Sequence, residues 1–238
     1  MSLDRLYPGP PETIDLDDRE RLLDLYRPPS ETWLRLNLIT SVTGAASGSD
    51  GTSETLTNPA DRRILGVIRE LADVVLIGAE SVRAEGYQQP RRSRIAILTA
   101  SGNLAGNRLE RSDGPAPIVI CPPSAVSRVL STIDGPDLLV IETEPDTNTD
   151  DRIGISAAVA ALRSRGLTSI VCEGGPGLAA QIVEAGLLDE FCLATSPRIG
   201  GAPFPVLGGA AIAEHRVELT QLLRDESSGL YARWAVRG

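Results

Sequence analysis

The chain has 238 residues and a mass of 25.2 kDa, and 42% of its residues are hydrophobic, which is enough to fill the core of one large α/β domain or of two small ones. Its formal net charge of −9 and isoelectric point near 4.8 argue against a surface that attracts nucleic acid or an anionic membrane, so any bound phosphate must be held by local contacts. All of its basic side chains except one histidine are arginines, which excludes a lysine Schiff base and the lysine of a Walker loop.

Few residues are suited to covalent or metal chemistry. His215 is the only histidine, and we interpret it as an ordinary surface or helix-end residue, because no orienting partner stands near it in the sequence. Cys121, Cys172 and Cys192 lie in apolar contexts without a C-x-x-C spacing, which favours buried thiols over metal ligands or disulfides. The sequence also lacks an apolar run of the roughly 20 residues that a membrane span needs and a signal-like start, so we expect a cytoplasmic protein.

The N-terminal segment, residues 1–32, is predicted to be an arm rather than a domain. Two proline-rich stretches, YPGPPE and YRPPSE, flank the sequence IDLDDRERLLDLY. The acidic start and apolar spacing of that sequence predict a short amphipathic helix. Residues 33–238 are predicted to form one domain.

Strand-like and helix-like segments alternate from Trp33 onward. Nearly continuous apolar runs, typical of strands covered on both faces, predict strands over 33–42, 72–79, 93–100, 116–122, 137–143 and 168–174. Apolar residues at three- and four-residue spacing predict helices over 58–72, 122–133, 155–166 and 175–186. This alternation predicts an α/β fold with a mostly parallel central sheet, flanking helices and right-handed crossovers.

The C-terminal part has a different pattern. Strand-like segments over 189–197, 215–226 and 229–236 follow one another without a helical pattern between them, and ESSG at 226–229 is typical of a turn. We therefore expect antiparallel strands at an edge of the sheet.

Ligands of an open parallel sheet bind beyond the carboxyl ends of its strands, where loops lead into helices. The segment EGGPGL, residues 173–178, stands at such a point. Its glycines allow the backbone to approach a ligand, and Pro176 suits the first turn of a helix whose N–H groups attract an anion. The segment is a candidate diphosphate site, with a plain strand-to-helix turn as the alternative.

The residues Ser81 and Glu85 follow another predicted strand, in AESVRAEGY. They are either ligand contacts or a hydroxyl cap and a solvated acid. Arg69, near the end of a predicted helix, offers a planar fork suited to a phosphate, and an exposed arginine is its alternative.

Three sequence blocks, taken in this order, carry a resemblance to a known family. They are the run from Leu36 to Tyr87, then IAILTASG, then VCEGGPGLAAQIVEAGLLDEFCLATSPRIGG. They resemble the C-terminal reductase domain of the riboflavin-pathway deaminase-reductases, and most closely the stand-alone actinobacterial pyrimidine reductases. The resemblance runs from about Trp33 to the C-terminus.

This resemblance implies a dihydrofolate-reductase-like fold, a homodimer, and NADPH as the hydride donor. The implied substrate is a 5-amino-6-(5-phosphoribosylamino)uracil-type pyrimidine, whose sugar is reduced to a ribityl chain. Matched by position, Ser53, Arg69 and Glu173 are the implied substrate contacts. The implied cofactor contacts are Gly78, Ala79, Ser81, Glu85, Thr99, Ser101, Gly174, Gly175, Pro176, Gly177 and Leu178; of these, Thr99 and Ser101 are matched to a 2′-phosphate.

The sequence departs from the family pattern at two points. The family reads S-[LM]-D-G after the first strand of the domain, whereas this chain has Thr43 in place of the aspartate. Nothing in the chain matches the H-x-E and P-C-x-x-C signature of the zinc deaminases, so we expect the reductase step alone.

Two other functions remain open from the sequence. One is reduction of dihydrofolate or a pterin, because fold resemblance does not fix the substrate. The other is a nucleotide-binding module without turnover. The presence of Ser53, Arg69 and Glu173 together favours a working substrate site over this last alternative.

Overall fold

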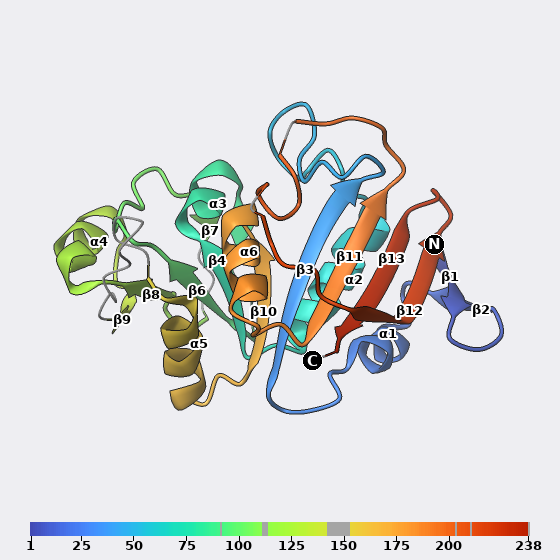
Figure 1. The fold of residues 1–238 in the computed structure, drawn as a ribbon, viewed down its shortest axis with the longest axis horizontal. Coiled ribbons are helices and arrows are strands. Elements are labelled where there is room, and N and C mark those ends of the chain that lie inside the picture. The colour runs from blue at the N-terminus through green and yellow to red at the C-terminus, as the bar shows by residue number, and fades with distance from the viewer. Residues whose placement is uncertain (91, 111–113, 142–152, 203, 210, 238) are drawn as a thin grey trace.

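The computed structural model describes residues 1–238 except 91, 111–113, 142–152, 203, 210 and 238. In the described part, an 11-stranded sheet has the order β2-β1-β12-β13-β11-β3-β10-β4-β6-β8-β9 (Figure 1). Its strands are β1 (Ser2–Tyr7), β2 (Glu12–Asp15), β3 (Trp33–Ser41), β4 (Val74–Gly78), β6 (Arg94–Leu98), β8 (Ile118–Cys121), β9 (Asp137–Val140), β10 (Ser169–Gly174), β11 (Glu190–Ser196), β12 (Val217–Asp225) and β13 (Leu230–Val236). Two short strands, β5 (Tyr87–Gln88) and β7 (Leu109–Glu110), pair separately.

The helices are α1 (Arg19–Tyr26), α2 (Pro59–Glu70), α3 (Ala79–Ala84), α4 (Val126–Thr132), α5 (Ile155–Ser164) and α6 (Pro176–Glu184), with a 3₁₀ turn, η1 (Pro123–Ala125), before α4. Each predicted helix begins close to its sequence signal. In α2, the side chain of Asn58 caps the helix by accepting from the N–H of Asp61, and Pro59 occupies the first turn. No helix in the described residues is both long enough and apolar enough to cross a membrane.

The strands from β11 to β9 in the sheet order all pair in parallel, and β13, β12, β1 and β2 extend the sheet in antiparallel fashion. Helices α5 and α6 lie on one face and α2 on the other (Figure 1). The strand β10 shows why its run is continuously apolar: Ile170 and Cys172 pack into the cluster with α5 and α6, and Val171 packs into the cluster with α1 and α2. The predicted α/β fold with a mostly parallel sheet and antiparallel C-terminal strands is confirmed.

Several details differ from the prediction. The arm contains strands β1 and β2 besides its predicted helix, and β1 pairs with β12, so the C-terminal hairpin is inside the sheet rather than at its edge. Only Leu3 of β1 is buried, so the strand lacks an apolar pattern. The helix α3 was not among the predicted helices, and it has only six residues. The last two residues of the strand predicted over 137–143 lie outside the described residues.

A buried ion cluster ties the parallel and antiparallel parts together. The carboxylate of Glu190 accepts from Arg35 of β3 and, at 2.8 Å, from Nε of Arg233 of β13. Arg35 also donates to the backbone carbonyl of Tyr26 at 2.8 Å, which fixes the end of α1. Burial raises the pKa of Glu190, but the charges of Arg35 and Arg233 outweigh it and lower that pKa below the ordinary value.

Candidate active site

The carboxyl ends of β4 and β10 meet in a glycine-rich corner. A Cβ added to Gly78, the last residue of β4, would lie 3.6 Å from the backbone nitrogen of Gly175. Gly174 has a φ of +111°, a conformation that L side chains rarely adopt, and its peptide bond to Gly175 is cis. The structure thus brings the glycines at the ends of β4 and β10 together, and the φ of Gly174 is the feature that requires a glycine here.

The first turn of α6 forms one wall of this corner. Gly175 is its N-cap and Pro176 its first helical residue, while no atom lies within 4 Å of the place where a Cβ of Gly177 would be. Leu178 is buried under the turn. Gly208 packs against this turn, since a Cβ added to it would lie 3.4 Å from the backbone nitrogen of Gly177. The start of α6 is therefore a helix N-terminus that is open beside Gly177 and covered on one side by Gly208, and an anionic group would bind on the open side.

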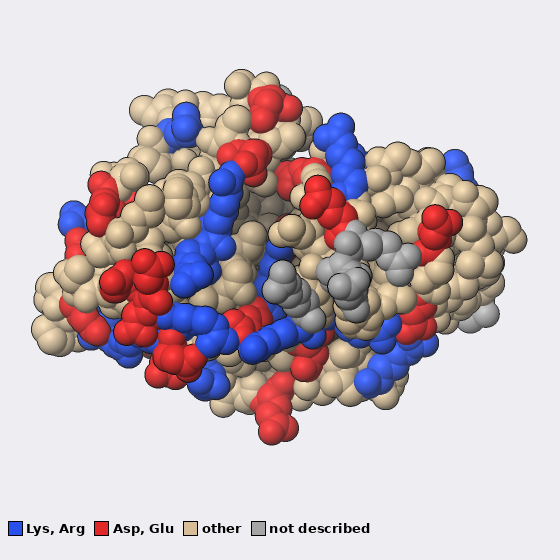
Figure 2. All heavy atoms as spheres, turned by 180° about the vertical axis from the view of Figure 1, so that it is seen from behind, with Lys and Arg blue, Asp and Glu red and all other residues tan. Residues whose placement is uncertain are grey.

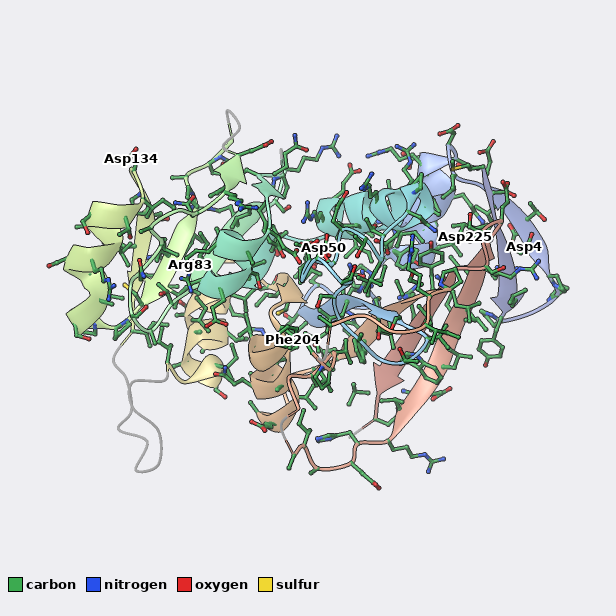
Figure 3. All side chains as sticks on the ribbon, turned by 90° about the horizontal axis from the view of Figure 1, so that it is seen from above. Asp4, Asp50, Arg83, Asp134, Phe204 and Asp225 are labelled. Carbon is green, nitrogen blue, oxygen red and sulfur yellow. The ribbon has the colours of Figure 1, made fainter. Side chains whose placement is uncertain are left out.

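The helix α3 forms the opposite wall. Ala79, its first residue, is buried. A Cβ added to Gly175 would lie 3.1 Å from the hydroxyl oxygen of Ser81, so Ser81 faces the glycine corner. Arg83, labelled in Figure 3, donates at 2.6 Å to the carbonyl oxygen of Asn103 and so ties α3 to the loop after β6.

That loop after β6 holds the two hydroxyls matched to a 2′-phosphate. Thr99 is buried, and its Oγ accepts from the N–H of Gly102 at 3.0 Å. Ser101 is exposed, and its Oγ accepts from the N–H of Asn103 at 3.3 Å. Both side chains shape the turn, and Ser101 is the one open to solvent.

Arg69 and Glu173 form an ion pair, which the sequence did not predict. Nε and Nη2 of Arg69 donate to the two carboxylate oxygens of Glu173 at 2.7 and 2.6 Å. The side chain of Arg69 is 19% exposed and that of Glu173 5%. Burial lowers the pKa of Arg69, but the charge of Glu173 and the hydrogen bonds to it outweigh burial and raise the pKa above the ordinary value. Glu173 directly precedes Gly174, so the pair lies next to the glycine corner.

Tyr87 is a member of this site that sequence reasoning missed. The guanidinium carbon of Arg69 lies 5.7 Å from the centre of the Tyr87 ring, within the range of a cation–π contact. Burial raises the pKa of Tyr87 well above its ordinary value, and the charges of Glu173 and Glu85 add to that rise. The phenol therefore stays protonated at neutral pH. Tyr87 lies just after α3, in the two-residue strand β5, and so short a strand has no recognisable sequence pattern.

Ser53 and Glu85 are also brought together, and the charge of Glu85 acts on Tyr87. The backbone N–H and the hydroxyl of Ser53 donate to the two carboxylate oxygens of Glu85 at 3.0 and 3.2 Å. The family resemblance matched Ser53 to the substrate and Glu85 to the cofactor. Their hydrogen bonds bring a predicted substrate residue into contact with a predicted cofactor residue. Glu85 thereby anchors the loop between β3 and α2.

Thr43 stands where the family has an aspartate, and here it joins two loops. Its Oγ lies 3.0 Å from the hydroxyl oxygen of Ser41 and accepts from the N–H of Gly200 at 2.9 Å. The same two loops meet again where the N–H of Ala46 donates to the carbonyl oxygen of Phe204 at 2.8 Å. In Figure 3, Asp50 and Phe204 mark these loops over the middle of the sheet.

A cavity of about 660 Å³ adjoins the Arg69–Glu173 pair on the α2 side of the sheet. Figure 2 shows arginine side chains gathered around a hollow in the middle of this face. The lining residues that matter for charge are Arg19, Arg69, Glu70, Arg92 and Glu110. The sequence reasoning missed Arg19 and Arg92, because one lies in the arm and the other in a loop without a pattern.

Other reactive groups are absent from this site. In the described part of the chain, no cluster of histidine, cysteine, aspartate and glutamate side chains could hold a metal ion. All three cysteines are free and buried, as expected, and burial raises the pKa of Cys172 to about 12, so its thiol is not a nucleophile at neutral pH. His215 is exposed. The site offers charges, hydroxyls and backbone rather than covalent chemistry.

Comparison with known proteins gives a consistent picture. Residues 32–229 match the family described as the RibD C-terminal domain. The riboflavin biosynthesis protein RibD of Mycobacterium tuberculosis H37Rv is 26% identical over 189 residues, which cover 78% of this chain and 47% of that protein. The chain thus spans about half the length of the curated relatives it matches.

Two solved structures are similar to this one. A pyrimidine reductase-like protein from Corynebacterium diphtheriae superposes with a TM-score of 0.77 at 25% identity, covering 92% of this chain and 99% of that one. The riboflavin biosynthesis reductase Rib7 of Saccharomyces cerevisiae superposes with a TM-score of 0.66 at 14% identity, covering 92% and 100%. The second likeness is one of fold.

Proposed function

The chain belongs to the family of the RibD C-terminal domain, and we propose that it is an NADPH-dependent reductase of 5-amino-6-(5-phosphoribosylamino)uracil in riboflavin biosynthesis. The observation that carries the proposal is the position of the Arg69–Glu173 pair. It lies at the end of β10, directly before the glycine corner at the start of α6. The end of β10 thus places the charged pair proposed to contact the substrate directly next to the residues proposed to hold the cofactor.

The residues of the glycine corner fit a dinucleotide. Gly78 and Gly175 approach each other closely, and the place of a Cβ on Gly177 is open at a helix N-terminus, so the diphosphate would lie beside Gly177 on the side that Gly208 does not cover. Ser81 and the exposed Ser101 are the nearest hydroxyls on the neighbouring loops, and we assign Ser101 to the 2′-phosphate that distinguishes NADPH from NADH. When bound, the nicotinamide supplies the hydride.

The substrate residues orient the pyrimidine. The fork of Arg69 is taken by Glu173, so Arg69 holds the carboxylate of Glu173 in place rather than binding a phosphate with both nitrogens itself. A fixed carboxylate of this kind accepts hydrogen bonds from ring N–H groups or sugar hydroxyls. The phosphate would then extend into the adjoining cavity, where Arg92 lies.

The protein's contribution is mainly orientation. Reduction of the ring-opened ribosylamino group consumes one NADPH and one proton: a hydride adds to the sugar carbon of the C=N bond and a proton to its nitrogen. This chain must therefore hold the C=N bond against the hydride donor and keep water out of the site. Orientation and exclusion of water can together lower an activation barrier by several kcal/mol, roughly 7 to 11 in favourable cases. The partly buried Glu173 and the buried Tyr87 border such a site.

Dihydrofolate is the competing substrate, because Thr43 replaces the family aspartate and its hydroxyl is occupied by Gly200. Steady-state oxidation of NADPH with each substrate in turn decides between them. We expect a higher kcat/KM with the phosphoribosylaminouracil. A kcat/KM at least tenfold higher with dihydrofolate would contradict the proposal, and binding of NADPH without turnover on either substrate would leave a nucleotide-binding module.

We also propose a homodimer in the cytoplasm. The face of β11 and β13 opposite α2 carries no helix in the described part of the chain (Figure 1), and Ile199, Phe204, Val217 and Leu230 are exposed apolar residues in the C-terminal half of the molecule. Such a surface suits a two-fold interface. Sedimentation at micromolar concentration should show twice the chain mass of 25.2 kDa, and a particle of the chain mass alone would contradict the dimer.

A further inference from the structure

The cavity beside Arg69 receives a side chain from the N-terminal arm. Arg19, the first residue of α1, lines it together with Glu70 at the end of α2 and Arg92 in the segment before β6. These three residues come from parts of the chain that are far apart in sequence. The cavity is therefore complete only when the arm is docked.

A single carboxylate holds both guanidinium groups in place. Nε of Arg19 donates to Oε2 of Glu70 at 3.1 Å, and both Arg19 and Arg92 also donate to Oε1 of the same residue. The second partner of Arg19 is Glu20, which is 77% exposed, so water screens that contact. Two cations thus share one partly buried anion, and their side chains are 40% and 73% exposed, so both can be reached by an anionic ligand. Glu110 is the other carboxylate that lines the cavity.

The arm is anchored firmly enough to place Arg19. The side chain of Asp18 caps α1 by accepting from the N–H of Arg21 at 3.0 Å, and Leu22 and Leu23 are buried in the cluster shared with α2. Strand β1 pairs with β12. The backbone of Arg19 is therefore held from both sides, by the helix interface and by the sheet.

One further polar group of the cavity lacks a partner. Ser93 lines it, and its hydroxyl is buried without a hydrogen-bond partner among the described residues. Buried hydroxyl groups usually have a partner, and a ligand oxygen could supply one here. This observation is independent of the arginines, and a small movement of the Ser93 side chain would expose its hydroxyl to a polar ligand.

We propose that Arg19 determines specificity for the phosphate group of the substrate, with Glu70 as the positioning residue that aims Arg19 and Arg92 at it. The proposal rests on the proposed function, since it takes the phosphoribosyl group as the ligand. A phosphate carries between one and two negative charges near neutral pH and three acceptor oxygens, which match two guanidinium groups. The arm is then part of the substrate site rather than an appendage.

The test compares Arg19→Ala with Arg21→Ala. Arg21 lies on the same helix and pairs with Glu12 at 2.8 Å, but it does not line the cavity. With the phosphorylated substrate, Arg19→Ala should raise KM about tenfold or more, the loss typical of one charge-assisted hydrogen bond, while kcat changes little. With the dephosphorylated substrate its effect should be within about twofold, because the group that Arg19 recognises is absent. Arg21→Ala should resemble the wild type with both.

A purely structural role of Arg19 gives a different result. The proposal is wrong if Arg19→Ala lowers the melting temperature and raises KM equally for both substrates. It is also wrong if the KM of neither substrate changes. Arg19→Lys should restore part of the affinity, since it keeps the charge but loses the fork.

A binding measurement separates this proposal from the proposed function. Calorimetric titration with ribose 5-phosphate and with ribose needs no turnover. Binding of ribose 5-phosphate that is lost in Arg19→Ala and kept in Arg21→Ala supports the phosphate site even if the wild type reduces neither pyrimidine. Equal binding by the wild type and Arg19→Ala, or none by either, overturns it.

Discussion

Breaking the Arg69–Glu173 pair one partner at a time, and then removing both, tests whether the two side chains act as a unit. The two hydrogen bonds of 2.7 and 2.6 Å and the 5% exposure of Glu173 mean that either single change leaves a poorly solvated charge behind. Glu173→Gln and Arg69→Ala should each lower kcat/KM by roughly tenfold to a thousandfold, which is about 1.4 to 4 kcal/mol of transition-state stabilisation.

The double variant provides the sharper number. Independent contributions would add to about 2.8 to 8 kcal/mol, whereas a unit loses little more than the worse single variant, so the coupling free energy should approach the loss of the milder single variant, at most about 1.4 to 4 kcal/mol. Steady-state kinetics at saturating NADPH measure it. Arg62→Ala is the matched control, because Arg62 lies on α2 but pairs with Glu54 at a site where both side chains are more than half exposed, and its effect should stay within about twofold.

The cofactor affinity supplies the second half of this test. The NADPH dissociation constant of the three variants should change by less than about threefold, as measured by nucleotide fluorescence. Additive losses in kcat/KM would refute the reasoning that the pair is a unit. Loss of NADPH binding with an unchanged substrate KM would show that the pair belongs to the cofactor site.

Two other predictions follow from the glycine corner and from the buried ion cluster. Gly175→Asp should abolish NADPH binding in a folded protein. The Cβ of the new side chain would lie 3.1 Å from the Ser81 hydroxyl, and its charge would repel a diphosphate at the start of α6. An unchanged NADPH affinity would contradict the assignment of this loop to the cofactor. The lowered pKa of Glu190 means that its ion cluster stabilises the fold above the ordinary glutamate value of 4.5 and that this stability is lost as the pH falls through the lower folded-state pKa. Urea unfolding should thus show that the wild type loses more stability at acid pH than Glu190→Gln does. Glu190→Gln itself should cost about 3 to 5 kcal/mol, because it leaves the buried Arg35 and the partly buried Arg233 without their anion; identical pH profiles would contradict this assignment.

The sequence predicted secondary structure best where both faces of an element are buried. The runs around Ile170 and Val75 are apolar at every position because both faces of β10 and β4 are covered, so pattern alone located these strands. The helix α2 was equally clear, since Asn58 and Pro59 mark its start. The strand β1 escaped because it packs by one leucine and is otherwise held by backbone pairing with β12, which has no sequence signature.

The fold brings several of the predicted site residues together, in pairings that the sequence did not predict. Glu173 and Arg69 were both assigned to substrate by their position in the family pattern, yet their side chains meet across 104 residues of sequence, and only the tertiary fold brings them together. Tyr87 and Arg19 carry no local pattern at all. Tyr87 belongs to the candidate site because charged side chains surround it, and Arg19 lines the cavity because α1 packs on α2.

The most direct test of the proposed reductase is the fate of the hydride. The protein is incubated with 5-amino-6-(5-phosphoribosylamino)uracil and NADPH that carries deuterium at both C4 positions of the nicotinamide, and the product is examined by mass spectrometry and NMR. We predict a ribitylamino product with one deuterium on the former anomeric carbon, formed together with an equal amount of oxidised cofactor. An unlabelled product, a label at another carbon, or oxidation of NADPH without a ribityl product would contradict the account.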